Sequence, residues 1–231
     1  MGQSSLNEIA QAANAQTAPS AGITENSTLL AAPRASKEQA RAYIVKLGST
    51  AYTNRDINLI LNHYWNHAVP VGLDPLLAVA QCIHETSFEG HPISSWWSRR
   101  PRRNPAGIGV NGRTRSTPPP DPQNWAGDPQ DNPTIWRAGL SFANWEVAVR
   151  AQLGRLLAYA IPTGQGTNEQ KALIDFALSV RPLGASLRGS APTLKPLGAR
   201  HNTTGMGWAT PGVQYGARIA AIAKKIQDTI A

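Results

Sequence analysis

The chain has 231 residues, of which 41% are hydrophobic and 16% are charged, proportions typical of a globular protein. No apolar run approaches the ~18 residues needed to cross a bilayer, so we expect no membrane-spanning helix. The net charge of +8 indicates an anionic partner such as nucleic acid, a membrane surface or an acidic cell envelope. The single cysteine, Cys82, excludes an intramolecular disulfide and a multi-cysteine zinc site.

The first 35 residues are rich in Ala, Gln, Ser and Asn, a composition typical of flexible segments. They contain no basic segment followed by an apolar one, so they do not form a recognisable signal peptide. We therefore predict a flexible tail over residues 1–35 and a single folded domain over residues 36–231.

Three helices are expected to begin after Ser36, Thr53 and Asp74, which are residue types that cap helix N-termini. Gln39 follows Ser36 by three residues and completes a capping box. The third helix has Pro75 at its first position and is apolar on nearly all sides. A helix of that kind belongs in a protein interior.

The helical pattern then disappears from residue 90 to residue 141, where Pro, Gly, Arg, Asp and Trp are frequent. Loops of that length inside a domain usually act as lids or binding lobes. Helices resume at Asn144 and Asn168, both expected as caps, and a last helix is expected to start at Thr210-Pro211. Its apolar stripe would consist of Tyr215, Ile219, Ile222, Ile226 and Ile230. The predicted fold is mainly α, with a helical core and a long irregular or small β lobe.

Glu85 stands in the last turn of the apolar third helix, one turn after Gln81. Burial disfavours the carboxylate form, and so does the negative end of the helix dipole. No Lys or Arg lies three or four residues away to offset either effect. The pKa of Glu85 should therefore be raised, as a general acid near neutral pH requires. The alternative is that Glu85 is the solvated end of a core helix.

Four motifs in this order resemble one known family. They are "LLAVAQCIHETSFEG" (76–90), "NPAGIGVNG" (104–112), "FANWEVAVRAQLGRLL" (142–157) and "MGWATPGVQYGARIAAI" (206–222). They are similar to the acidic helix end, the glycine turn, the following helix and the closing motif of bacterial and phage N-acetylglucosaminidases. These enzymes have a lysozyme-like α+β fold and occur as autolysins and flagellar cell-wall hydrolases. The closing motif departs from the family at Trp208, where Tyr is usual, and at Pro211, where Asp is usual.

The resemblance implies that Glu85 is the general acid that protonates the glycosidic oxygen of peptidoglycan. It implies neither a metal nor an organic cofactor. The residues expected to bind substrate are Gln81, Asn104, Gly107, Trp208 and Trp97. Trp97 belongs to the segment "SSWWSRRPRRN" (94–104), which suits glycan rings and anionic wall polymers; structural packing and single-stranded nucleic acid are the alternatives.

Most glycosidases use a second carboxylate. Asp121 and Asp128 are the candidates chosen here, with Asp131 and Glu89 also near in sequence. Because the aspartates stand among Pro, Gly and Asn, each can equally be a turn residue. A mechanism with one acid, in which the N-acetyl group or the muramyl hydroxyl is the internal nucleophile, stays open.

His63 and His67 are four residues apart on one helix and could hold a metal, but no third ligand is evident.

Together with the resemblance, the sequence predicts a monomeric endo-β-N-acetylglucosaminidase that acts on peptidoglycan at the cell wall, outside the cell or on a virion. A lytic transglycosylase, a muramidase and a non-catalytic module that binds cell wall or nucleic acid are the alternatives; nucleic acid is disfavoured as a partner.

Overall fold

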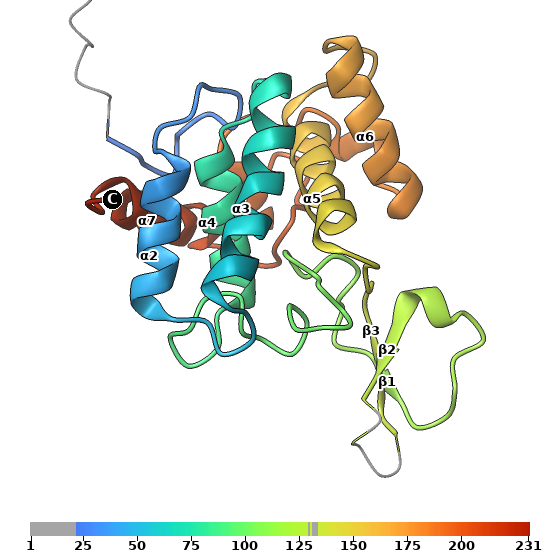
Figure 1. Ribbon diagram of the computed structural model, residues 1–231. Helices are drawn as coiled ribbons and strands as arrows, with labels where there is room; N and C mark the ends of the chain where they lie inside the picture. Colours follow the sequence, from blue (N-terminus) through green and yellow to red (C-terminus); the bar gives the residue numbers. More distant parts are fainter. Residues whose placement is uncertain (1–21, 129, 131–133) are drawn as a thin grey trace, which may run out of the picture.

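The computed structural model describes residues 22–128, 130 and 134–231, and these form a mainly helical body with a small antiparallel sheet (Figure 1). The α-helices are α2 (Lys37–Leu47), α3 (Asn54–Ala68), α4 (Pro75–Thr86), α5 (Trp145–Ala160), α6 (Asn168–Val180) and α7 (Tyr215–Gln227). Short 3-10 turns are η1 (Val69–Val71), η2 (Pro122–Asn124), η3 (Ala185–Leu187), η4 (Lys195–Leu197) and η5 (Ala199–His201). The predicted fold class, helical with a small β lobe, is confirmed.

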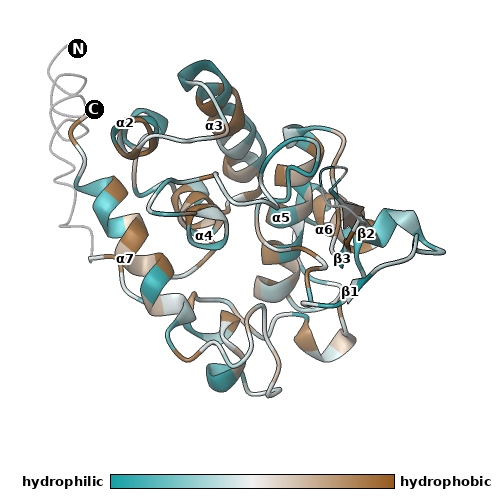
Figure 2. Ribbon diagram, turned by 90° about the horizontal axis from the view of Figure 1, so that it is seen from below, coloured by the Kyte–Doolittle hydropathy of each residue, from teal (hydrophilic) through white to brown (hydrophobic). Residues whose placement is uncertain are grey.

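Helix α4 forms the centre of the body. Seen from below, α2, α3, α5 and α7 surround it (Figure 2). Every residue of α4 from Pro75 to Ile83 is buried, which agrees with its apolar sequence on all sides. The last turn of this central helix carries Glu85, so the packing of the whole body fixes the position of that carboxyl group.

The helix starts follow local sequence signals with two exceptions. Ser36, Thr53, Asp74 and Asn144 each accept a backbone hydrogen bond from the first turn of their helix, as predicted. Helix α6 is capped by Thr167 rather than Asn168, which is the first residue of the helix.

Helix α7 begins at Tyr215 and not at Thr210-Pro211. Gly212 lies between the two with φ of 62°, in the left-handed region that a right-handed helix does not use. The predicted apolar stripe also ends early, because Ile230 lies beyond the helix and is 95% exposed.

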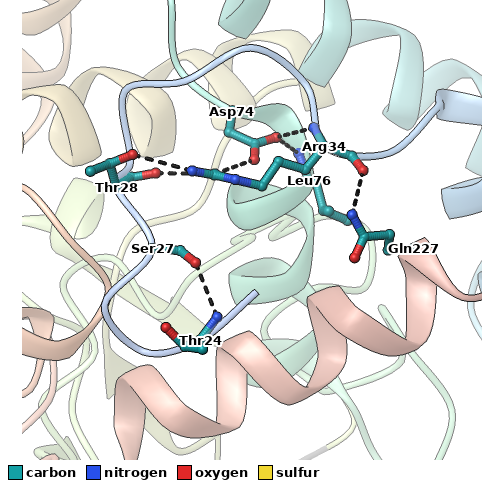
Figure 3. Close-up of polar contacts among 7 residues, drawn as sticks. All are labelled: Thr24, Ser27, Thr28, Arg34, Asp74, Leu76 and Gln227. Atoms are coloured by element: carbon teal, nitrogen blue, oxygen red, sulfur yellow. Dashed lines mark hydrogen bonds and ion pairs between the residues drawn. The ribbon is translucent and has the colours of Figure 1, made fainter. Parts of the chain in front are cut away.

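Residues 22–35 correct the predicted domain boundary. They pack against the helical body, with Ile23, Leu29 and Ala35 buried. The Arg34 guanidinium lies 2.7 Å from Asp74 Oδ2, and the Arg34 carbonyl accepts a hydrogen bond from Gln227 of α7 (Figure 3). The expectation of a flexible tail is therefore wrong for residues 22–35, while residues 1–21 lie outside the described residues.

The small lobe lies within the excursion predicted between the helices. Strands β1 (Thr114–Arg115), β2 (Trp125–Gly127) and β3 (Trp136–Ala138) pair antiparallel in the order β1-β3-β2. The lobe projects from one end of the body, below α5 (Figure 1). None of the helices in the described ranges is long and apolar enough to span a bilayer.

Candidate active site

Glu85 lies at the point where α4 ends and the chain turns extended. The helix closes at Thr86, and Ser87 has extended backbone angles and donates its side-chain hydroxyl to Ile83 O at 2.7 Å. The Glu85 side chain keeps partial exposure although the helix before it is buried. The carboxyl group can therefore meet a ligand while most of its surroundings are protein.

Tyr215, the first residue of α7, holds the carboxyl group of Glu85. The Tyr215 hydroxyl donates a hydrogen bond to Glu85 Oε1 and accepts one from Gln81 Nε2 at 3.0 Å. Tyr215 is buried, and its hydroxyl is bonded to Gln81 on one side and to Glu85 on the other. Sequence analysis assigned Tyr215 only to an apolar stripe; its contact with Glu85 was missed.

A buried chain of hydrogen bonds continues from Tyr215 into the core. Gln152 of α5 donates to Gln81 Oε1 at 2.8 Å and accepts from the Tyr64 hydroxyl at 2.6 Å. Gln81 is 1% exposed, and its amide is engaged at both ends. Its expected role in binding substrate is therefore wrong; Gln81 positions Tyr215 instead.

The pKa of Glu85 is raised from 4.5 to about 7, mainly because burial disfavours the charged form. The hydrogen bond from Tyr215 acts in the opposite direction and lowers the pKa. Among the described residues, no other carboxylate contributes to this shift. The expectation of a raised pKa is confirmed, and a large fraction of the carboxyl groups is protonated at neutral pH.

Gly107 leaves the second oxygen of Glu85 open. A β-carbon built on Gly107 would stand 3.3 Å from Glu85 Oε2, and the φ of Gly107 is 61°. Both observations favour glycine here, since a side chain would be strained and would crowd the carboxyl group. Gly107 therefore lies beside the carboxyl group of Glu85, and its expected contact with substrate stays a prediction.

Trp208 is tied to the same turn. Its indole nitrogen donates to the Ala106 carbonyl at 3.1 Å, and its ring centroid lies 5.9 Å from that of Tyr159. The structure thus brings Trp208, Gly107 and Glu85 together from segments far apart in the sequence.

Two surface hollows are lined in part by residues that neighbour Glu85. The first, about 390 Å³, is lined by His84, Tyr215 and residues 211–214. The second, about 170 Å³, is lined by Gly107, Tyr159 and Trp208 among others. Glu85 itself lines neither hollow, but its Oε1 accepts a hydrogen bond from Tyr215 of the first and its Oε2 lies next to Gly107 of the second.

Asn104 has a structural role in place of the one predicted. Its side chain is fully buried. The amide nitrogen donates to the carbonyls of Ile108 and Leu140 at 2.8 and 3.0 Å, and Oδ1 accepts from the Ile108 amide at 2.9 Å. Asn104 shapes the turn that carries Gly107 and has no group left for substrate.

The remaining predicted site residues, Trp97, Asp121 and Asp128, belong to the long excursion between α4 and α5. Trp97 is partly buried, and its ring lies so close to Gly139 that a β-carbon there would be 2.3 Å from it. Asp121 caps η2 and accepts from Asn124 within the same turn. Asp128 accepts from the Trp96 indole at 2.9 Å, and this bond lowers its pKa. Both aspartates thus act as turn or packing residues, and Asp131 lies outside the described residues.

No metal-binding cluster of three or more His, Cys, Asp or Glu side chains occurs in the described part of the chain. His63 and His67 stack with ring centroids 6.4 Å apart, and His67 Nε2 lies 3.4 Å from Glu146. The contact between His67 and Glu146 joins α3 to α5.

Comparison with known proteins gave no match, whether with family models, curated proteins or solved structures. The case for a function therefore depends on the geometry around Glu85.

Proposed function

We propose that the protein is a glycoside hydrolase that cleaves the glycan strand of peptidoglycan, with Glu85 as the general acid. The observation that carries this proposal is the carboxyl group of Glu85, with its pKa of about 7, held by Tyr215 beside two hollows. The motifs that resemble N-acetylglucosaminidases favour the endo-β-N-acetylglucosaminidase reaction.

The two oxygens of Glu85 have different surroundings, and this suggests which of them carries the proton. Oε1 accepts the Tyr215 hydrogen bond, while Oε2 faces Gly107. A proton on Oε2 would be free to pass to the oxygen of a glycosidic bond placed over the glycine. General acid catalysis of this kind contributes about 10²- to 10⁴-fold in rate.

The cleavage is best written with one protein carboxyl group. As Glu85 protonates the leaving oxygen and the bond from it to C1 breaks, the N-acetyl oxygen of the same sugar forms a bond to C1. Water then attacks C1 while the bond from the N-acetyl oxygen to C1 breaks and the acetamide is restored, and the Glu85 carboxylate accepts the proton of that water. This mechanism agrees with the absence of a second carboxylate contribution at Glu85 among the described residues, and it needs no metal or organic cofactor.

The charge of the chain suits this substrate. A net charge of +8 favours association with peptidoglycan and with the anionic polymers of the wall. The protein would then act as a monomer at the cell wall, outside the cell or on a virion.

The test is digestion of purified peptidoglycan, followed by borohydride reduction and mass spectrometry of the products. Wild-type protein should release fragments with reduced N-acetylglucosamine ends, and Glu85→Gln should lose at least 100-fold in rate. Glu38→Gln is the matched control, because Glu38 is an exposed carboxylate on α2; it should retain full activity.

Other product ends would redirect the proposal. Reduced N-acetylmuramic acid ends would make the protein a muramidase, and anhydromuramyl ends would make it a lytic transglycosylase. No release by the wild type, with glycan still bound, would contradict catalysis and favour a non-catalytic wall-binding module. Salt-sensitive binding to DNA in place of glycan would favour the nucleic-acid module.

A further inference from the structure

The smaller of the two hollows beside Glu85 contains two arginines. We call it the Arg155 hollow: about 170 Å³, lined by Arg155, Arg181, Tyr159, Trp208 and the backbone of residues 107–110. Arg155 lies on α5, and Arg181 directly follows α6. Pockets for whole small molecules run from about 300 to 1,000 Å³, so this hollow suits one substituent of a larger ligand.

Neither arginine has an acidic partner within the described ranges. The ion pairs found there involve other residues. Arg155 Nη1 donates to the main-chain carbonyls of Arg181 at 3.2 Å and Pro182 at 3.4 Å, and the Arg155 side chain also hydrogen-bonds Tyr159. Tyr159 is the one acidic side chain that lines the hollow. Burial raises the pKa of its hydroxyl, so Tyr159 is neutral near pH 7 and does not balance the two charges.

The packing holds both guanidinium groups in place. The Cζ atom of Arg155 lies 5.8 Å from the Trp208 ring centroid and 5.9 Å from that of Tyr159. A β-carbon on Gly109 would stand 3.2 Å from Arg181 Nη1. Because Gly109 has no side chain, the Arg181 guanidinium can pack directly against its backbone. Burial lowers the pKa of Arg155, and the nearby charge of Arg181 lowers it further. Two like charges kept together and partly out of water would be stabilised by a bound anion.

We propose that the Arg155 hollow is an anion subsite that binds a carboxylate carried by the glycan substrate. This inference rests on the proposed function. Guanidinium groups bind carboxylates with two parallel hydrogen bonds and without losing their charge. Gly107 lines the hollow and also faces Glu85 Oε2, so a bound carboxylate would lie close to the bond that is cleaved. Peptidoglycan offers two sources: the lactyl carboxylate of muramic acid where no peptide is attached, and the carboxylates of the stem peptide.

The test compares one glycan in charged and neutral forms. Peptide-free glycan carries free lactyl carboxylates, and coupling to methylamine converts them to neutral amides. Wild type should cleave the charged form with at least tenfold higher kcat/KM. Arg181→Gln should lose that preference, because without the anion contact its kcat/KM for the charged form should fall to its own value for the neutral form.

Arg150→Gln is the matched control. Arg150 is five residues before Arg155 on α5 and also lies over an aromatic ring, that of Phe176, at 4.3 Å, but it does not line the Arg155 hollow. Its loss removes one charge from the protein and should leave the preference for charged glycan intact. Arg181→Lys is the second variant; it keeps the charge without the planar fork and should keep part of the preference.

The outcomes separate the two levels of the proposal. If Arg181→Gln and Arg150→Gln reduce cleavage of both glycans by the same factor, the subsite is contradicted and only general charge attraction remains. If the defect of Arg181→Gln occurs on peptide-bearing glycan alone, the subsite is supported and its anion belongs to the stem peptide. If wild type cleaves neither glycan, the proposed function fails. The subsite is then decided by NMR titration: N-acetylmuramic acid must bind more tightly than N-acetylglucosamine and lose that advantage in Arg181→Gln.

Discussion

The acidity of Glu85 is set by two opposing contacts. Burial raises its pKa to about 7, and the hydroxyl of Tyr215 restrains that rise by donating to Oε1. The hydroxyl can donate in this direction because its oxygen accepts the amide of Gln81. Tyr215 is therefore a positioning residue that orients the carboxyl group and tunes its proton affinity.

Tyr215→Phe should raise the pKa of Glu85, because the hydrogen bond that favours the carboxylate is lost. The general acid that we propose must be protonated to act, so wild-type kcat/KM should fall above about pH 7. In Tyr215→Phe the same fall should occur at higher pH. Carbon NMR of the Glu85 carboxyl group measures the pKa directly, independent of any reaction.

Tyr43→Phe is the control for that experiment, since Tyr43 lies on α2 and the hydroxyl that donates to Glu85 is that of Tyr215 on α7. Its pH profile should match that of the wild type. An unchanged or lowered Glu85 pKa in Tyr215→Phe would contradict the tuning role.

Glu85→Gln should change stability in a pH-dependent way. The pKa of Glu85 is about 7 in the folded protein against an ordinary 4.5, so the folded state holds the proton more tightly and loses stability as pH rises from 4.5 to 7. The shift corresponds to at most about 3 kcal/mol. Glu85→Gln removes this loss, so it should increase the free energy of unfolding at pH 8 and leave it nearly unchanged at pH 4. Urea unfolding at both pH values measures this.

Glu89→Gln is the control and should show no difference between the two pH values. The raised pKa would be contradicted if the stability of Glu85→Gln, measured relative to wild type, were lower at pH 8 than at pH 4.

Helix starts were largely predictable from the sequence because a cap and its partner lie within three residues of each other. The two misses have different causes. Thr167 and Asn168 are both capping residue types, but Gln170 stands three residues after Thr167 and completes a capping box with it, so a local signal was overlooked. Thr210-Pro211 resembles a helix start, yet Gly212 adopts a left-handed conformation and the helix begins after it.

The site was only partly predictable because its contacts connect distant elements. Glu85 could be found from its place at the end of an apolar helix, and its raised pKa follows from that burial. Tyr215 lies 130 residues away, and Gln152 lies 71 residues from Gln81. No pattern within one helix distinguishes a glutamine that binds substrate from one that is fully bonded inside the core, so Gln81 was misassigned.

Gln152→Leu should destabilise the fold strongly. The Tyr64 hydroxyl would lose its acceptor and Gln81 Oε1 would lose its donor, and each stranded buried group costs about 1–3 kcal/mol. We expect a total loss of about 2–5 kcal/mol in urea unfolding. Gln165→Leu, at an exposed position, should change stability by less than about 0.5 kcal/mol.

A double-mutant cycle makes this prediction specific. Tyr64→Phe removes the hydroxyl that Gln152→Leu would strand, so the double variant should be more stable than the sum of the two single losses implies. Additive losses would mean that the two residues do not form a coupled hydrogen bond.

At the scale of the whole molecule, composition misplaced the start of the folded domain. Within residues 22–35, Ile23, Leu29 and Ala35 are buried, and the backbone bonds to two parts of the body, the segment 192–195 and the start of α4. The Leu29 amide donates to Pro192 O at 2.9 Å, the Asp74 amide donates to Leu29 O at 2.9 Å, and the Lys195 amide donates to Glu25 O at 2.7 Å. A composition average over 35 residues cannot detect such a segment, because a few buried side chains and a set of main-chain bonds fix it in place.

Leu29→Ala tests whether this segment is part of the fold. Leu29 is 0% exposed, while its neighbour Leu30 is 38% exposed, so the two adjacent leucines form a matched pair. Truncation of a buried leucine costs about 2–5 kcal/mol, and the same change at Leu30 should cost less than about 1 kcal/mol. Urea unfolding of both variants measures the difference. Equal and small losses of unfolding free energy in the two variants would mean that residues 22–35 do not stabilise the fold and belong with the predicted flexible tail. A large loss at Leu29 alone would mean that the segment helps to hold α4, through Asp74 at its start, and thereby the carboxyl group at the other end of that helix.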